Sequence, residues 1–141
     1  MPTKHPYILL IDDDQDDLDL LSALLEKSGV VTKAYNSGVK AQIYLRLLSD
    51  CSILPALIIV DYNMPRQNGQ QVLTALKSDR YTQDIPIIVY STLMSAILKV
   101  DLMKLGAYDC LTKPGKVEEL ADQVSMFIRL AYSSGLNKHV A

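Results

Sequence analysis

Three short, continuous apolar runs constrain most strongly how this chain of 141 residues can fold. The runs are Tyr7–Ile11, Leu57–Val60 and Ile87–Tyr90, and each contains isoleucine or valine. A strand that is apolar at every position has both faces buried, which is typical of a parallel sheet covered by helices on both sides. The runs therefore predict strands of a covered parallel sheet.

Segments with helical periodicity alternate with these runs, and two weaker strand signals at residues 30–35 and 108–111 complete the pattern. Apolar residues recur at helical spacing in the stretches 18–25, 39–48, 72–76, 97–105 and 117–128. Five strands alternating with five helices predict an α/β fold with an open, doubly wound, five-stranded parallel sheet. We expect residues 1–141 to form one domain, with a core of about residues 7–131 and a frayed tail at 132–141.

The composition argues against several classes of protein. The chain has 14 Lys and Arg against 16 Asp and Glu, and a net charge of −2 gives no basic footprint for nucleic acid. We also expect no membrane span, because the apolar runs are far too short, and no signal peptide. The two cysteines, Cys51 and Cys110, do not suggest a disulfide framework, so the expected location is the reducing cytoplasm.

Polar residues follow four of the predicted strands directly. Asp12 and Asp13 follow the first, Asp61 the third, Ser91 and Thr92 the fourth, and Lys113 the last. Functional sites of such sheets lie at the carboxyl ends of the strands, so we expect these side chains to meet at one edge.

The residue types at this edge suit phosphoryl transfer. Clustered carboxylates repel one another unless a cation lies between them, and Mg²⁺ is a hard ion that prefers oxygen ligands and also binds phosphate. A lysine and a hydroxyl can stabilise phosphoryl oxygens. A carboxylate nucleophile with these partners predicts transfer of a phosphoryl group onto an aspartate.

The order of these motifs resembles that of a receiver domain of two-component signalling, of the stand-alone kind similar to chemotaxis regulators. The spacing agrees with the resemblance, which extends from about Tyr7 to about Ala131. The matching segments are residues 8–14, 57–65 with Gly69, 86–92, 106–107 and 111–114.

The resemblance implies a flavodoxin-like strand order 2-1-3-4-5 and a role for each site residue. Asp61 is the expected phosphoacceptor, and Lys113 and Ser91 are expected to contact the phosphoryl group. The expected Mg²⁺ ligands are Asp13 directly, Asp12 partly through water, Asp61, and the backbone carbonyl of Asn63. Family members have a cis peptide bond before the proline that corresponds to Pro114, which is expected to hold the lysine loop.

The resemblance also implies partners. The expected phosphodonor is a phosphohistidine on a sensor histidine kinase or a phosphotransfer protein, and the expected output is a switched protein-binding surface facing an unknown downstream protein. We expect a monomer or a phosphorylation-linked homodimer. The chain is expected to be no enzyme beyond catalysing its own phosphorylation and dephosphorylation.

One position departs from the family pattern. An aromatic residue usually precedes the lysine by three positions, and Cys110 occupies that place here. This difference raises the question whether Cys110 weakens switching, or whether Tyr108 or Tyr90 substitutes for the aromatic residue.

Other interpretations of the same residues stay open at this point. An aspartate-nucleophile, Mg²⁺-dependent phosphatase uses similar groups, and an unphosphorylated docking module could keep the fold without the chemistry. Four further acids are interpreted as helix N-terminal charge, which favours the helix dipole: Asp14, Asp16, Asp17 and Asp19.

Overall fold

The structure is a computed structural model, and it describes residues 5–48 and 53–140. Cys51 lies outside the described residues. The elements, in chain order, are β1 (Tyr7–Ile11), α1 (Gln15–Lys27), β2 (Val31–Tyr35), α2 (Gly38–Leu47), β3 (Leu57–Asp61), α3 (Gly69–Lys77), β4 (Ile87–Ser91), α4 (Ala96–Lys104), β5 (Asp109–Thr112) and α5 (Val117–Val140).

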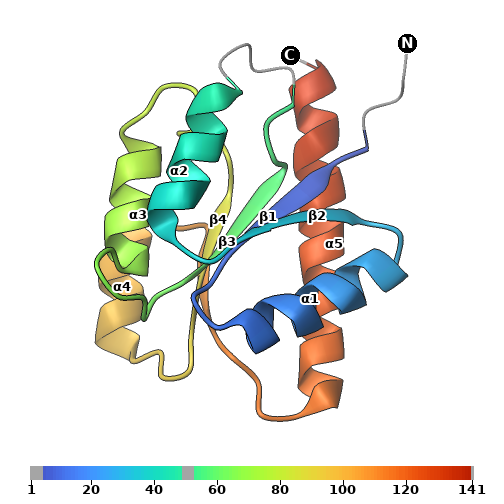
Figure 1. Cartoon of the computed structure of the whole chain (residues 1–141), viewed down its shortest axis with the longest axis vertical. Helices are drawn as coiled ribbons and strands as arrows, with labels where there is room; N and C mark the ends of the chain where they lie inside the picture. Colours follow the sequence, from blue (N-terminus) through green and yellow to red (C-terminus); the bar gives the residue numbers. More distant parts are fainter. Residues whose placement is uncertain (1–4, 49–52, 141) are drawn as a thin grey trace.

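The five strands form one parallel sheet in the order β2-β1-β3-β4-β5. This confirms the predicted doubly wound α/β fold and its strand order. The order reverses direction beside β1, so the ends of β1 and β3 flank the point where a site is expected in such sheets. Figure 1 shows the sheet between the two groups of helices.

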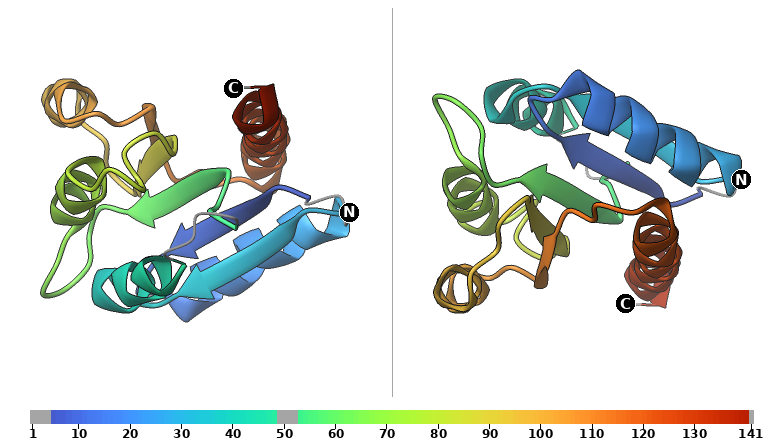
Figure 2. Two further views of the ribbon diagram at one scale, coloured as in Figure 1. Left: turned by 90° about the horizontal axis from the view of Figure 1, so that it is seen from above. Right: turned by 90° about the horizontal axis from the view of Figure 1, so that it is seen from below.

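Helices cover both faces of the sheet, as the continuous apolar strands require. Alternate strand residues such as Ile11, Val60 and Cys110 pack with α2, α3 and α4 in one buried cluster. Their neighbours, including Leu10, Ile59 and Tyr90, pack with α1 and α5 in the other. The two end-on views show this division of the helices (Figure 2).

The helix ends follow the local signals in the sequence. The side chains of Asp14, Ser37, Asn68 and Ser95 accept hydrogen bonds from backbone N–H groups in the first turns of α1, α2, α3 and α4. Gly29 follows α1 with φ +87°, a left-handed conformation that glycine adopts without steric cost.

The buried face of α2 is not the face that carries its large apolar residues, which the sequence predicted to be buried. Val39, Ile43 and Leu47 are exposed, and Leu47 retains 78% of its accessible surface. Gly38, Ala41 and Leu45 are buried instead. The small residues at 38 and 41 allow α2 to lie close to its neighbours, which a face of large side chains would prevent.

Two other helices also differ from their apolar patterns. Ile97 in α4 and Val117 in α5 are exposed, whereas Leu102, Val124 and Phe127 supply the buried contacts.

The prediction that residues 132–141 form a frayed tail is wrong for the backbone, because the helix α5 continues to Val140. Helix formation is cooperative, so once α5 is packed on the core through the buried Ala131, adding each further residue costs little free energy. The helix therefore continues through residues of low helix propensity. Among the described residues, the helices are too short or too polar to cross a membrane.

Candidate functional site

The strand register brings the polar strand ends to one edge of the sheet. Ile11 pairs with Val60, so Asp12 and Asp61 follow neighbouring positions of β1 and β3. Ser91 pairs with Thr112, which places the start of the Lys113 loop beside the end of β4. Four separate segments therefore contribute side chains to one place.

Gly69 allows α3 to begin against the end of β3. Its backbone N–H donates to the Tyr62 carbonyl at 2.9 Å. A Cβ atom at this position would lie 2.7 Å from the Asp61 carbonyl oxygen and 2.8 Å from the Tyr62 Cα. Only glycine fits this approach without a shift of backbone, so the position of Asp61 depends on it.

Asp12, Asp13 and Asp61 form a carboxylate cluster. One carboxylate oxygen from each lies within 4.8 Å of the corresponding oxygens of the other two. Asp12 and Asp61 are buried and Asp13 is exposed. Hard oxygen ligands at this spacing fit a divalent cation such as Mg²⁺.

The carboxylates of the cluster differ in their hydrogen bonds to the rest of the protein. Asp12 Oδ1 accepts the backbone N–H of Asp14 at 3.0 Å, and Asp12 Oδ2 accepts Lys113 Nζ at 2.8 Å. No described residue bonds to the Asp13 carboxylate, which is therefore free for an ion. The Asp13 carboxylate thus differs from that of Asp12, both of whose oxygens accept hydrogen bonds.

Lys113 Nζ lies among three carboxylates. It is 2.8 Å from Asp12 Oδ2, 2.9 Å from Asp17 Oδ2 and 3.1 Å from Asp61 Oδ1. The Lys113 side chain is 17% exposed and the Asp61 side chain 6%. The contacts with Asp12 and Asp17 are hydrogen bonds, and the contact with Asp61 is an ion pair.

The electrostatics of the site follow from burial and crowding of like charge. Burial raises the pKa of Asp61 to about 6, and the Asp12 carboxylate adds to the rise, while Lys113 opposes it. Burial also raises the pKa of Asp12 above its usual value. Burial disfavours the charged form of Lys113, but hydrogen bonds to Asp12 and Asp17 outweigh this effect, and the Lys113 pKa is raised. The site therefore holds excess negative charge that a cation would relieve.

Ser91 lies at the end of β4, and its side chain is fully buried. Its hydroxyl donates to the Leu93 carbonyl at 3.1 Å and accepts the Asn63 side-chain N–H at 3.3 Å. The structure thus brings Ser91 to Asn63, two residues after Asp61, and Asp61 pairs with Tyr90, the residue before Ser91. A hydroxyl engaged in this way must exchange its Leu93 bond before it can donate to a group on Asp61.

The peptide bond before Pro114 is trans, because the described residues contain no cis peptide bond. The expected cis bond is therefore wrong for this structure. The Lys113 backbone N–H instead donates to the Ser91 carbonyl at 2.8 Å, and this bond ties the lysine loop to β4. The trans form is the ordinary state of a peptide bond before proline, favoured by about 0.5–1 kcal/mol.

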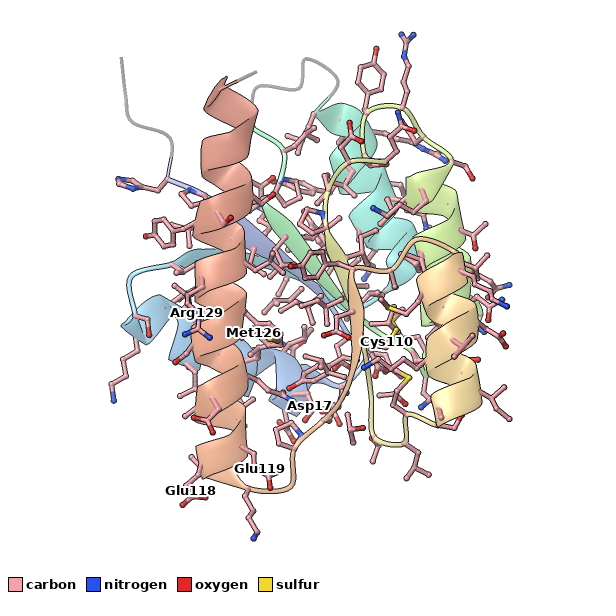
Figure 3. All side chains as sticks on the ribbon, turned by 180° about the vertical axis from the view of Figure 1, so that it is seen from behind. Asp17, Cys110, Glu118, Glu119, Met126 and Arg129 are labelled. Atoms are coloured by element: carbon pink, nitrogen blue, oxygen red, sulfur yellow. The ribbon has the colours of Figure 1, made fainter. Side chains whose placement is uncertain are left out.

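Asp17 is a site residue that the sequence pattern does not indicate. Asp17 was interpreted as helix N-terminal charge, and it does lie in the first turn of α1. Its contact with Lys113 joins residues 96 positions apart, so no local pattern signals it. Figure 3 shows Asp17 between the lower part of α5 and the loop that leads into it.

Tyr90 and Tyr108, the two candidates for the missing aromatic residue, both lie away from Cys110. Cys110 is buried in the cluster with α4, whereas Tyr90 packs on the opposite face, with its ring edge-on to Phe127. Tyr108 is 56% exposed and precedes β5, at the far end of that strand from Thr112. Neither tyrosine therefore occupies the space beside Cys110 and Ser91.

Comparison with known proteins gives relatives of one kind. The family model described as "Response regulator receiver domain" matches residues 8–125. The DNA-binding dual master transcriptional regulator RpaA of Synechocystis is 36% identical over 124 residues, which is 88% of this chain and 49% of RpaA. The chain spans about half the length of RpaA and of the Haemophilus influenzae CpxR homolog.

Solved structures agree in fold. The phosphorylated cyanobacterial phytochrome response regulator RcpA matches with a TM-score of 0.81 and 26% identity, over 93% of this chain and 96% of RcpA. The Mn²⁺-bound form of response regulator Rcp1 matches with a TM-score of 0.72 and 25% identity, over 86% of this chain and 91% of Rcp1. The family match, the strand order and the chemistry of the strand ends agree, and the chain belongs to the response regulator receiver domain family.

Proposed function

We propose that Asp61 is the residue that accepts the phosphoryl group in this receiver domain. Membership of the family gives the chain a function in phosphorelay signalling by phosphorylation of an aspartate. The observation that carries the assignment to Asp61 is that its carboxylate belongs to the cluster and has one oxygen 3.1 Å from the Lys113 ammonium. Asp12 and Asp17 also contact Lys113, but Asp12 has both oxygens occupied and Asp17 lies outside the cluster.

The transfer step uses the chain's own groups as follows. An Asp61 oxygen attacks phosphorus of a phosphohistidine, the new O–P bond forms, and the P–N bond breaks with its electron pair passing to the imidazole nitrogen. Lys113 stabilises the charge that gathers on the phosphoryl oxygens. Ser91 moves its hydroxyl from the Leu93 carbonyl to a phosphoryl oxygen afterwards. Attack of water on phosphorus later releases phosphate and restores the carboxylate.

The carboxylate cluster fits Mg²⁺, which when bound neutralises phosphoryl charge. Asp13, Asp61 and the Asn63 backbone carbonyl would hold the ion, with Asp12 contributing partly through water. The Mn²⁺-bound Rcp1 structure supports a divalent ion in this type of fold. Asp12, Asp13 and Asp61 keep the oxygen donors that such an ion needs.

The partners follow from the chemistry of the family. The donor is a sensor histidine kinase or a phosphotransfer protein, and the output is a contact with a downstream protein through the surface of α4, β5 and α5. Lys99 on that surface pairs with Asp109 at 3.3 Å, and such a pair could be rearranged by a partner. The cytoplasmic location, the single-domain organisation, the monomer or linked dimer, and catalysis limited to its own phosphorylation stay predictions.

The test is incubation of the purified chain with a small acyl phosphate and Mg²⁺, followed by measurement of the intact mass. We expect a gain of one phosphate in the wild type and in Asp101→Asn, an exposed control on α4. We expect no gain in Asp61→Asn or in the wild type with a metal chelator. A full gain of one phosphate in Asp61→Asn would contradict the assignment of Asp61 as the phosphoacceptor. Steady turnover of a generic phosphomonoester would favour a phosphatase.

A further inference from the structure

Asp17 makes a contact with the Lys113 ammonium that the transfer step described above does not use. Its Oδ2 atom lies 2.9 Å from Lys113 Nζ, as close as the Asp12 contact at 2.8 Å and closer than the Asp61 contact at 3.1 Å. The Asp17 side chain is 46% exposed, and it lies in the first turn of α1, outside the carboxylate cluster. Asp17 therefore binds the lysine without belonging to the candidate metal site.

The ammonium group is already surrounded by carboxylates. It donates hydrogen bonds to Asp12 and Asp17, and Asp61 is its third ion-pair partner. A phosphoryl group on Asp61 adds oxygens beside Lys113, and these compete with the carboxylates for an ammonium group that has only three hydrogens. Asp17 is the most exposed of the three partners, so water can replace Lys113 there most easily.

We propose that Asp17 is a positioning residue that competes with the phosphoryl group for Lys113. The proposal rests on the assignment of Asp61 and Lys113 above and adds a control on that site. In the unphosphorylated chain Asp17 draws Lys113 towards α1, and in the phosphorylated chain the ammonium turns to the phosphoryl oxygens. Asp17 thus sets how strongly the site holds a phosphoryl group.

The surroundings of this contact support a movable lysine. A small cavity adjoins it, lined by polar atoms and by apolar side chains of α1 and α5. Its lining includes Asp17, Lys113 and Pro114 together with Leu20 and Leu120. The lysine side chain therefore has space beside it on the α1 side.

The test uses the beryllium trifluoride anion, a phosphoryl mimic, at saturating Mg²⁺, with binding followed by ¹⁹F NMR. Asp17→Asn should bind the anion about two- to fivefold more tightly than the wild type, because one competitor for Lys113 is gone. Asp17→Glu, which keeps a carboxylate within reach, should return the affinity to the wild-type range. Asp17→Asn preserves the shape of the side chain, and the α1 cap on Asp14 is unaffected.

Asp16→Asn is the matched control. Asp16 lies in the same first turn and carries the same charge, but it makes no contact with Lys113 in the described structure. Equal affinities of the Asp16→Asn and Asp17→Asn variants would overturn the proposal, because the effect would then be general charge. Weaker binding by Asp17→Asn would also overturn it.

A double-mutant cycle with Lys113→Gln tests whether Asp17 acts through its contact with Lys113 or through its negative charge alone. The gain from Asp17→Asn should disappear in the Lys113→Gln background, and a gain that persists there would contradict the proposal. If the wild type binds no anion at Asp61, the proposed function fails as well. If the wild type binds it and Asp17→Asn does not differ from Asp16→Asn, only the role of Asp17 fails.

Discussion

At the scale of single residues, the site holds three carboxylates around one largely buried lysine. Asp61 and Asp12 are buried, and Lys113 balances only part of their charge. Such an arrangement costs stability when no ion is bound, because desolvation and like charge both disfavour the ionised acids. The buried carboxylates therefore suit binding of a cation and phosphoryl transfer better than they suit the stability of the fold.

The pKa of Asp61 makes this cost measurable. With a pKa of about 6 in the fold against an ordinary value of 3.8, folding favours the protonated acid. The penalty is absent well below pH 3.8, where both states are protonated; it grows as the pH rises through 3.8 and is complete above about pH 6. Without metal, Asp61→Asn should therefore stabilise the chain by about 1–3 kcal/mol at pH 7 and by only a small fraction of that at pH 4.

Denaturant unfolding of both proteins in a chelator, between pH 4 and pH 8, measures this difference. Asp101→Asn on the exposed face of α4 serves as the control and should follow the wild type. A difference between Asp61→Asn and the wild type that stays constant over this range would contradict the buried, raised pKa.

Individual site residues differ in how far the sequence could predict them. Asp12, Asp13, Asp61 and Lys113 follow predicted strands directly, so the rule that strand ends meet at one edge was enough to bring them together. Asp17 could not be found in this way, since a helix N-terminus already explains an acid at that position. Only the fold brings Lys113 to it.

At the scale of elements, the strands were predictable because complete burial leaves a continuous apolar signal in β1, β3 and β4. The buried faces of the helices were harder to predict. In α2 the large residues Val39 and Ile43 are exposed, while Gly38 and Ala41 provide close packing that a count of apolar residues does not detect. The end of α5 was missed because anchored helices continue past their last buried residue.

The junction of β3 and α3 gives a prediction at this scale. Gly69→Ala would place a Cβ atom within 2.8 Å of the backbone that follows Asp61, so α3 or the strand end must move. We expect a loss of about 1–3 kcal/mol in unfolding free energy, together with weaker Mg²⁺ binding. Denaturant unfolding and a metal titration measure the two effects.

Gly115→Ala is the control for this change, because a Cβ atom there meets no other atom within 4 Å. It should leave both the stability and Mg²⁺ affinity close to those of the wild type. Equal behaviour of the two alanine variants would show that the close approach of α3 does not hold the site.

At the scale of the whole molecule, binding of an ion to the folded state alone stabilises the entire fold. At ten times its dissociation constant, Mg²⁺ should raise the unfolding free energy by about 1.4 kcal/mol. Asp13→Asn should lose most of this gain, since Asp13 is the cluster member whose carboxylate has no bond within the described chain. Denaturant unfolding with and without Mg²⁺ measures it, at constant ionic strength; an undiminished gain in Asp13→Asn would place the ion elsewhere.

Hydride reduction of the acyl phosphate identifies the phosphorylated residue most directly. After incubation with a small acyl phosphate and Mg²⁺, borohydride converts a phosphorylated aspartate to homoserine, and peptide mass mapping locates the change. We expect homoserine at position 61 and at no other aspartate, with none in samples that lacked the phosphodonor. Homoserine at position 12, 13 or 17, or its absence from position 61 in a chain that has gained a phosphate, would contradict the assignment of Asp61.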